Sequence, residues 1–183
     1  MSNPLAPLAD IARTQVGHHE DGDSNTGSQI AAYQAATVLG TPTHGNGWPW
    51  CCAFVDWCIL HFIQEHRGIL SCEDRRPQTA SVEQFVDWAA KTGQLVIPHH
   101  KVPDPYTLQA GDIVAWHFPT GHHIGIVTGP QFLDSSKTLR FPTIEGNTSG
   151  TETGDQRNGG TVAEKVRGFA SVMCFIRLAV KPA

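Results

Sequence analysis

The sequence predicts an α+β fold, in which N-terminal helices pack on one face of a C-terminal antiparallel sheet. Two observations support this prediction. Before Gly93, apolar residues recur at the three-and-four spacing of amphipathic helices. After Gly93, the apolar runs are short, rich in β-branched residues and bounded by Gly, Pro or Asp. Helices first and strands second is the order of elements that favours an α+β domain.

Four helices are expected in the first half of the chain. The third has the clearest apolar stripe, which includes Cys51, Phe54, Cys58 and Phe62. In the fourth, Ser81 is placed to cap the N-terminus. The expected helices span Pro4–Gln15, Ser28–Val38, Trp50–His66 and Ser81–Lys91, with the third starting at either Trp50 or Cys51.

Five or six strands with hairpin-length connections are expected in the second half. A long polar stretch, Glu145–Gly160, is expected to be a loop, either functional or simply mobile. The expected strands span Leu95–Ile97, Asp112–Trp116, Ile124–Thr128, Thr138–Ile144, Thr161–Arg167 and Val172–Leu178.

The composition is that of one globular domain over residues 1–183. Apolar residues make up 40% and charged residues 16%, so the chain can bury a real core. The net charge is -4 and no basic run occurs, which argues against a nucleic-acid partner. No apolar run approaches the roughly 18–20 residues that a membrane span needs, so no membrane insertion is expected. The N-terminus lacks the basic and apolar regions of a Sec signal peptide.

The chain has 5 cysteines, an odd number that leaves at least one thiol unpaired within the chain. Cys51 follows Pro49 at the expected start of the third helix, where unpaired backbone N–H groups and the helix dipole stabilise a thiolate. A plain alternative is that Cys51 is one more buried apolar residue. Cys58 is expected to pack in the core, and a disulfide between two of Cys58, Cys72 and Cys174 stays open.

A thiolate also needs a base, and the predicted hairpin around residues 112–128 offers His122 and His123 at the start of its second strand. Glu145 and Asn147 follow at the end of a predicted strand. They lie two residues apart and would share a face of that strand. Either could hold an imidazole in the correct tautomer, as the third member of a triad does.

Three segments together resemble one known family. They are PWCCAFVDW around Cys51, GDIVAWHFPTGHHIGIVTG around His123, and IEGN with Glu145 and Asn147. The pattern resembles the CHAP family, the cysteine- and histidine-dependent amidohydrolases and peptidases that cut bacterial peptidoglycan. The N-terminal segment IARTQVGHHEDGDSNTGSQIAAYQ also resembles the lead-in of such domains, so the likeness covers roughly residues 8–178. It implies a papain-like α+β fold.

The resemblance also implies roles for particular residues. Cys51 matches the family's nucleophile, and Cys52 departs from the pattern because that position usually holds a smaller residue such as Ala or Ser. His123 matches the base, since it precedes an aliphatic residue and a glycine. The third member would be Glu145 or Asn147, and Glu145 is the preferred choice for orienting His123.

The implied chemistry is nucleophilic acyl transfer on an amide. The backbone N–H of Cys51 or Cys52 would stabilise the oxyanion at the helix start. Four further side chains are candidate substrate contacts, with the core as the plain alternative for the tryptophans. They are Trp48, Trp50, Trp116 and His122.

No cofactor and no metal is expected. Three His-His doublets occur, at 18–19, 99–100 and 122–123, and none has the ligand spacing of a zinc site. The segment EDGDSN lacks the spaced acidic ligands of a calcium loop. Glu20 and Asn25 are instead expected to shape the N-terminal loop or to line the cleft.

The expected protein is a monomeric peptidoglycan hydrolase, either a muramoyl-L-alanine amidase or an endopeptidase of the stem or cross-bridge. Without a Sec signal, it would be made in the cytoplasm and act in the periplasm or cell wall of a target cell. Delivery as a type VI secretion effector is the first expectation, with a cognate immunity protein as partner. A phage endolysin and a catalytically silent wall-binding module are the alternatives.

Overall fold

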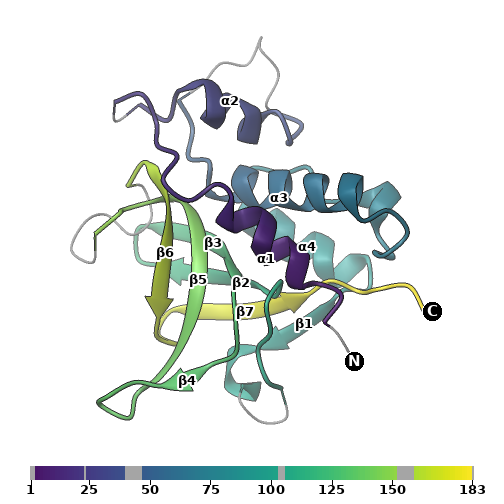
Figure 1. The fold of residues 1–183 in the computed structure, drawn as a ribbon, viewed down its shortest axis with the longest axis vertical. Helices are drawn as coiled ribbons and strands as arrows, with labels where there is room; N and C mark the ends of the chain where they lie inside the picture. The colour runs from purple at the N-terminus through teal and green to yellow at the C-terminus, as the bar shows by residue number, and fades with distance from the viewer. Residues whose placement is uncertain (1–2, 23, 40–46, 103–105, 152–158, 183) are drawn as a thin grey trace.

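The computed structural model describes residues 3–22, 24–39, 47–102, 106–151 and 159–182. The predicted α+β class is confirmed, because helices from the first half pack against an antiparallel sheet from the second half (Figure 1). The α-helices are α1 (Ala6–Arg13), α2 (Ser28–Gln34), α3 (Cys51–Glu65) and α4 (Val82–Lys91). Single 3-10 turns lie at Glu73–Arg75 and His99–Lys101.

The described strands form one seven-stranded sheet in the order β1-β7-β2-β3-β5-β4, with β6 paired to β5. Every pair in the sheet is antiparallel. The strands are β1 (Leu95–Pro98), β2 (Ile113–Phe118), β3 (Gly121–Val127), β4 (Phe132–Leu133), β5 (Leu139–Thr148), β6 (Thr161–Arg167) and β7 (Val172–Arg177).

Two expectations about the elements need correction. The sheet has one strand more than expected, because β4 is a two-residue strand too short to give an alternating pattern. The polar segment after Ile144 was expected to be a loop, yet β5 continues through Glu145 to Thr148. Buried hydrogen-bond partners stabilise the polar residues of this extension, and local polarity does not reveal such partners.

Helix α3 is the element that joins the helical layer to the sheet. It contacts α1 and α2 on one side and β3 and β5 on the other. Phe54, Val55, Ile59 and Phe62 are all fully buried, as its predicted apolar stripe requires. Ser81 caps α4 as predicted, since its hydroxyl accepts a hydrogen bond from the Gln84 backbone N–H.

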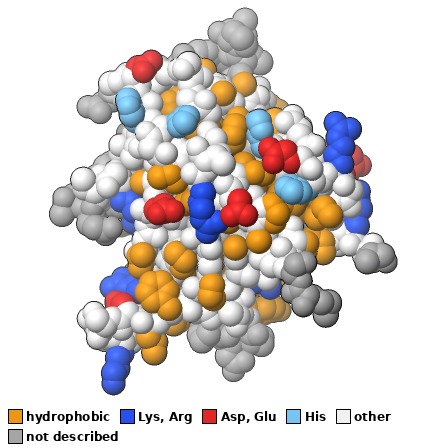
Figure 2. All heavy atoms as spheres, viewed as in Figure 1, with side chains coloured by type: hydrophobic (Ala, Val, Ile, Leu, Met, Phe, Trp, Pro, Cys, Tyr) orange, Lys and Arg blue, Asp and Glu red, His pale blue; other side chains and the backbone are white. Residues whose placement is uncertain are grey.

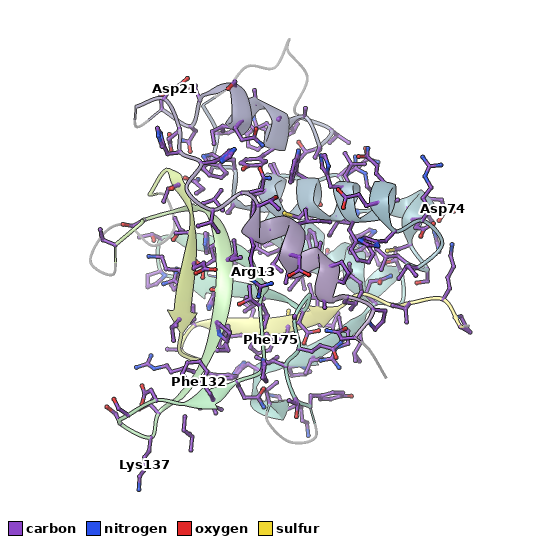
Figure 3. All side chains as sticks on the ribbon, in the orientation of Figure 1. Arg13, Asp21, Asp74, Phe132, Lys137 and Phe175 are labelled. Atoms are coloured by element: carbon purple, nitrogen blue, oxygen red, sulfur yellow. The ribbon has the colours of Figure 1, made fainter. Side chains whose placement is uncertain are left out.

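The core has a part on each face of the curled sheet. The larger part lies between the sheet and the helices, around Phe54, Ile124 and Ile144. The second part includes Trp116 and Phe175. Figure 3 shows Phe175 in the interior of the molecule, whereas Lys137 points outward from the tip of the turn between β4 and β5.

Gly146 sets how closely β5 approaches α3. A Cβ at this position would lie 2.6 Å from Phe54 Cβ and 2.9 Å from Trp50 Cζ3. We expect Gly146→Ala to lower the free energy of unfolding by about 1–3 kcal/mol through overpacking, measured by urea denaturation. Gly150→Ala is the matched control, because its Cβ would meet only Thr161 Cγ2 at 3.7 Å. Equal stability of the two variants would contradict this view of the contact.

All 5 cysteines are buried free thiols in the structure, so the disulfide left open between two of Cys58, Cys72 and Cys174 is not formed.

Among the residues that the structure describes, no helix has the length and apolar character to cross a bilayer. Exposed apolar side chains include Phe132 and Leu133, and Figure 2 shows hydrophobic side chains over the β4 region.

Candidate active site

Cys51 is the first residue of α3, and it is buried with 5% of its surface exposed. Trp50 is the N-cap residue and supplies no side-chain acceptor to the first turn. Its backbone oxygen accepts from the Phe54 N–H at 2.9 Å, which starts the helical hydrogen-bond pattern. The N–H groups of the first turn and the positive end of a 15-residue helix therefore lie next to the Cys51 sulfur.

Cys52 has a different environment although it is the next residue. It has no exposed surface, and burial raises the pKa of its thiol well above the ordinary value. The charges of Asp56 and Cys51 add to that increase. The Cys52 thiolate is therefore disfavoured, which leaves Cys51 as the thiol of this pair that suits a nucleophile.

His123 lies in β3, fully buried, with its Nε2 atom 3.0 Å from Glu145 Oε2. The Trp116 ring packs over the imidazole with a centroid distance of 5.6 Å. Burial alone would lower the pKa of His123, but interactions with the Cys51 thiol and with Glu145 outweigh it and raise the pKa to about 9. The other ring nitrogen, Nδ1, is buried and has no hydrogen-bond acceptor or donor of regular geometry. It is the nitrogen left for proton exchange with a neighbouring thiol.

Glu145 is fully buried in β5 and receives hydrogen bonds from several donors. Thr143 Oγ1 donates to Oε1 at 2.6 Å, and Arg167 Nε donates to the same oxygen at 2.8 Å. Arg167 Nη2 also donates to Oε2, the oxygen that contacts His123. Burial would raise the pKa of Glu145, but the bonds from Arg167 and His123 outweigh it and lower the pKa to about 2. The carboxylate is thus ionised at neutral pH.

Gly125 provides the space for Glu145. A Cβ on Gly125 would lie 2.7 Å from Glu145 Cγ and 3.1 Å from the Ile144 carbonyl oxygen. Because Gly125 has no side chain, the Glu145 side chain can lie over it and reach the imidazole of His123.

The residue hydrogen-bonded to His123 Nε2 is Glu145 rather than Asn147. Asn147 lies at an irregularity in the β5–β6 pairing between Glu145 and Thr148, with a positive φ of 55°. The regular alternation that would place Glu145 and Asn147 on one face therefore ends at this point. Glu145, the preferred choice, is the residue hydrogen-bonded to His123, and Asn147 is buried nearby in the chain.

Two of the four candidate substrate contacts belong to the core. Trp50 is 0% exposed and stacks on Tyr33 with centroids 5.5 Å apart, and Trp116 is 1% exposed. These two are corrected from cleft walls to packing residues, the plain alternative for large aromatic side chains. Trp48 is partly exposed, and its carbonyl oxygen accepts from Gln34 Nε2 at 3.3 Å.

His122 is the remaining candidate, and its side chain is 23% exposed. Its Nε2 lies 2.9 Å from His117 Nδ1 and 3.7 Å from Glu83 Oε1. It therefore lies between the tip of the β2–β3 hairpin and the first turn of α4, next to His123 in sequence.

In the N-terminal loop, Glu20 makes hydrogen bonds both within the loop and to the residue that precedes β6. Glu20 is nearly buried and accepts from the Asn25 backbone N–H, and its backbone N–H donates to the Gly160 carbonyl at 2.9 Å. Asp23, one of the acidic residues of the segment EDGDSN, lies outside the described residues. Within the described part of the chain, no group of three or more His, Cys, Asp or Glu is arranged to hold a metal ion.

Two contacts of the site were missed by the sequence analysis. Thr143 shares the strand alternation of Glu145, so its place could have been inferred from period two. Arg167 is 22 positions from Glu145 along the chain, and a single sequence carries no signal for that pairing. Away from the site, Asp112 is a buried partner of Arg177.

The two pKa shifts predict how stability depends on pH. Glu145 has a folded pKa of about 2 against an ordinary 4.5, so its stabilisation is present above pH 4.5 and lost as the pH falls towards 2. We expect the difference in free energy of unfolding between the wild type and Glu145→Gln, measured by urea denaturation, to become smaller as the pH falls from 4.5 towards 2. The corresponding difference between the wild type and His123→Gln is full below pH 6.5 and is lost as the pH rises through about 9. Differences in the free energy of unfolding that stay constant with pH for both variants would contradict these two shifts.

No family model matches the sequence, and no curated protein matches it. A solved structure described as the crystal structure of a wild type endolysin, LysIME-EF1, is similar with a TM-score of 0.45 and 15% sequence identity. The similarity covers 94% of this chain and 63% of that chain, so this chain spans less than two thirds of the endolysin's length.

Proposed function

We propose that the protein is a cysteine-dependent hydrolase that cleaves an amide bond of bacterial peptidoglycan. One observation carries the chemical part of the proposal. A nearly buried thiol at a helix start, Cys51, interacts with an imidazole, His123, whose far nitrogen is held by an ionised carboxylate, Glu145. This is the order of nucleophile, base and orienting group that thiol-based acyl transfer requires.

In the proposed mechanism, Cys51 attacks the amide carbonyl as a thiolate while His123 carries the proton. The imidazolium then gives this proton to the leaving amine, and a water molecule, deprotonated by His123, hydrolyses the thioester. Backbone N–H groups of Cys51 and Cys52 in the first turn of α3 stabilise the tetrahedral oxyanion. Glu145 keeps the imidazole in the tautomer and orientation that these proton transfers need.

The substrate class is supported by the sequence rather than by the geometry. The segments around Cys51, His123 and Glu145 resemble those of CHAP domains, whose substrate is peptidoglycan. The proposed bond is either the amide between muramic acid and L-alanine or a peptide bond of the stem or cross-bridge. Both are amides and need the same three groups.

The test is digestion of purified peptidoglycan followed by mass spectrometry of the soluble fragments. An amidase releases free stem peptides from intact glycan strands, and an endopeptidase releases muropeptides with shortened or uncoupled stems. Cleavage confined to glycosidic bonds, or no release from any peptidoglycan type, would contradict the proposal.

Chelation tests the chemistry in a separate experiment. We expect digestion in excess EDTA to proceed at the rate measured without it, because a thiolate and an imidazole carry the reaction. Loss of activity in EDTA with recovery on adding Zn²⁺ would favour a metal-dependent hydrolase instead. A known zinc amidase, assayed in parallel, is the control for complete chelation.

For the biological role, we propose an antibacterial effector delivered by a type VI secretion system, with a cognate immunity protein that covers the site. A phage endolysin would have the same chemistry. Production with and without an added Sec leader tests the site of action, since toxicity should require export. The neighbouring genes separate the two roles: an exported immunity-like protein favours the effector, and a holin favours the endolysin.

A further inference from the structure

We infer that Arg167 is a positioning residue for the proposed reaction, because its guanidinium fixes Glu145 in the orientation that holds His123. The inference rests on the proposed function and goes beyond it by adding a group outside the nucleophile, the base and the orienting carboxylate. The observations behind it are the contacts of the Arg167 side chain, which belongs to the last residue of β6.

The guanidinium reaches both carboxylate oxygens of Glu145. Arg167 Nε donates to Oε1 at 2.8 Å, and Nη2 donates to Oε2. Oε2 is also the acceptor for His123 Nε2 at 3.0 Å. A carboxylate held by the imidazole alone could turn about its last side-chain bond, whereas a planar two-pronged donor fixes the carboxylate plane. Thr143 Oγ1 adds a further donor to Oε1 at 2.6 Å.

The Trp116 ring lies against both the Arg167 guanidinium and the His123 imidazole. The Arg167 Cζ atom lies 5.8 Å from the Trp116 ring centroid, and the same tryptophan lies 5.6 Å from the His123 ring. The Arg167 side chain is 16% exposed, so it is largely held in place by the protein. One buried tryptophan therefore contacts both groups that bind Glu145.

The charge of Arg167 matters as well as its shape. A fully buried carboxyl group next to one imidazole would tend to take up a proton, and a neutral acid would not stabilise an imidazolium. Arg167 counters this tendency, since its bonds to Glu145 lower the pKa of the carboxyl group. Arg167→Lys keeps the charge but loses the two-pronged geometry, so it isolates the positioning effect.

The sheet supplies a matched control for this substitution. Arg177 donates from Nε to Asp112 Oδ1 at 2.7 Å and from Nη2 to Oδ2 at 2.7 Å. Asp112 is fully buried and Arg177 is 23% exposed, much as in the pair at the site. Arg177→Lys thus makes the same chemical change in the same kind of pair, next to β1 rather than next to His123.

The experiment measures hydrolysis kinetics with a soluble muropeptide and the titration of His123 by NMR, its signals being assigned from their absence in His123→Gln. We expect Arg167→Lys to lower kcat by about 10- to 100-fold with KM changed less than about twofold. The titration midpoint of His123 should fall by at least about one pH unit, because the imidazolium loses an oriented acceptor. Arg177→Lys should leave kcat and the titration as in the wild type while lowering the melting temperature.

Equal kcat and equal titration midpoints for Arg167→Lys and Arg177→Lys would overturn the inference and leave the proposed function standing. If the wild type hydrolyses no peptidoglycan, the proposed function fails, and the titration still decides whether Arg167 positions the pair. Arg167→Gln, with Arg177→Gln as its control, replaces the lysine variant if that variant does not fold, with a fall in the His123 midpoint and in kcat again expected only at position 167.

Discussion

Replacing Cys51 by Ala is expected to reduce peptidoglycan hydrolysis by about a thousandfold or more, whereas Cys52→Ala keeps the rate within about threefold of wild type. The two residues are adjacent and chemically identical, so the contrast isolates position. Cys51 is the first residue of α3 and interacts with His123, whereas Cys52 is fully buried with a raised pKa. Only Cys51 therefore has both a helix start and an imidazole to stabilise its thiolate.

The measurement is the initial rate of release of soluble fragments from dye-labelled peptidoglycan, corrected for the folded fraction of each variant. That correction matters because Cys52→Ala leaves a small gap beside α3, which costs stability. A loss of activity in Cys52→Ala with Cys51→Ala still active would reverse the assignment of the nucleophile. Full activity in both variants would rule out thiol catalysis at this helix start.

The second large effect is expected at His123. His123→Gln should lower kcat/KM by about 10²- to 10⁴-fold, because it removes the base that accepts and returns the proton. Glutamine keeps a polar side chain that can donate to Glu145, so the ionised carboxylate is not left without a partner at that position. The structural loss should therefore be smaller than the catalytic one.

His122→Gln is the matched control, since His122 is the neighbouring imidazole and is only partly buried. Its contacts run to His117 and Glu83, away from the carboxylate that binds His123. We expect kcat/KM in this variant to stay within about fivefold of the wild type. If His122→Gln were as damaging as His123→Gln, the base would have to be reassigned.

Much of the fold could be predicted because its patterns are local. The apolar stripe of α3, the Ser81 cap and the hairpin of β2 and β3 depend on spacing within a few residues. The continuation of β5 through Glu145 could not be read in this way. Its polar residues are stabilised by Thr143, Arg167 and His123, whose partnership exists only after the sheet has formed.

The candidate site, like the fold, was predictable where it depends on local sequence and not where it depends on contacts between distant residues. The placement of Cys51 at a helix start and of His123 in a hairpin strand follows from local sequence, and the structure brings both to one place. The burial of Trp50 and Trp116 does not follow, since a tryptophan beside a reactive residue suits a cleft wall and a core equally well. Arg167 could not be inferred, because its role depends on the β5–β6 pairing.

Site-specific alkylation tests the central claim most directly. Wild-type protein is treated with limiting iodoacetamide, and the remaining activity is compared with the fraction of each cysteine that is modified, measured by peptide mass spectrometry. The account predicts that activity falls in direct proportion to modification of Cys51, with the four other thiols largely unmodified because burial raises the pKa of each of them and so disfavours the reactive thiolate. Undiminished hydrolysis by protein fully alkylated at Cys51, or inactivation that tracks Cys52 instead, would contradict it.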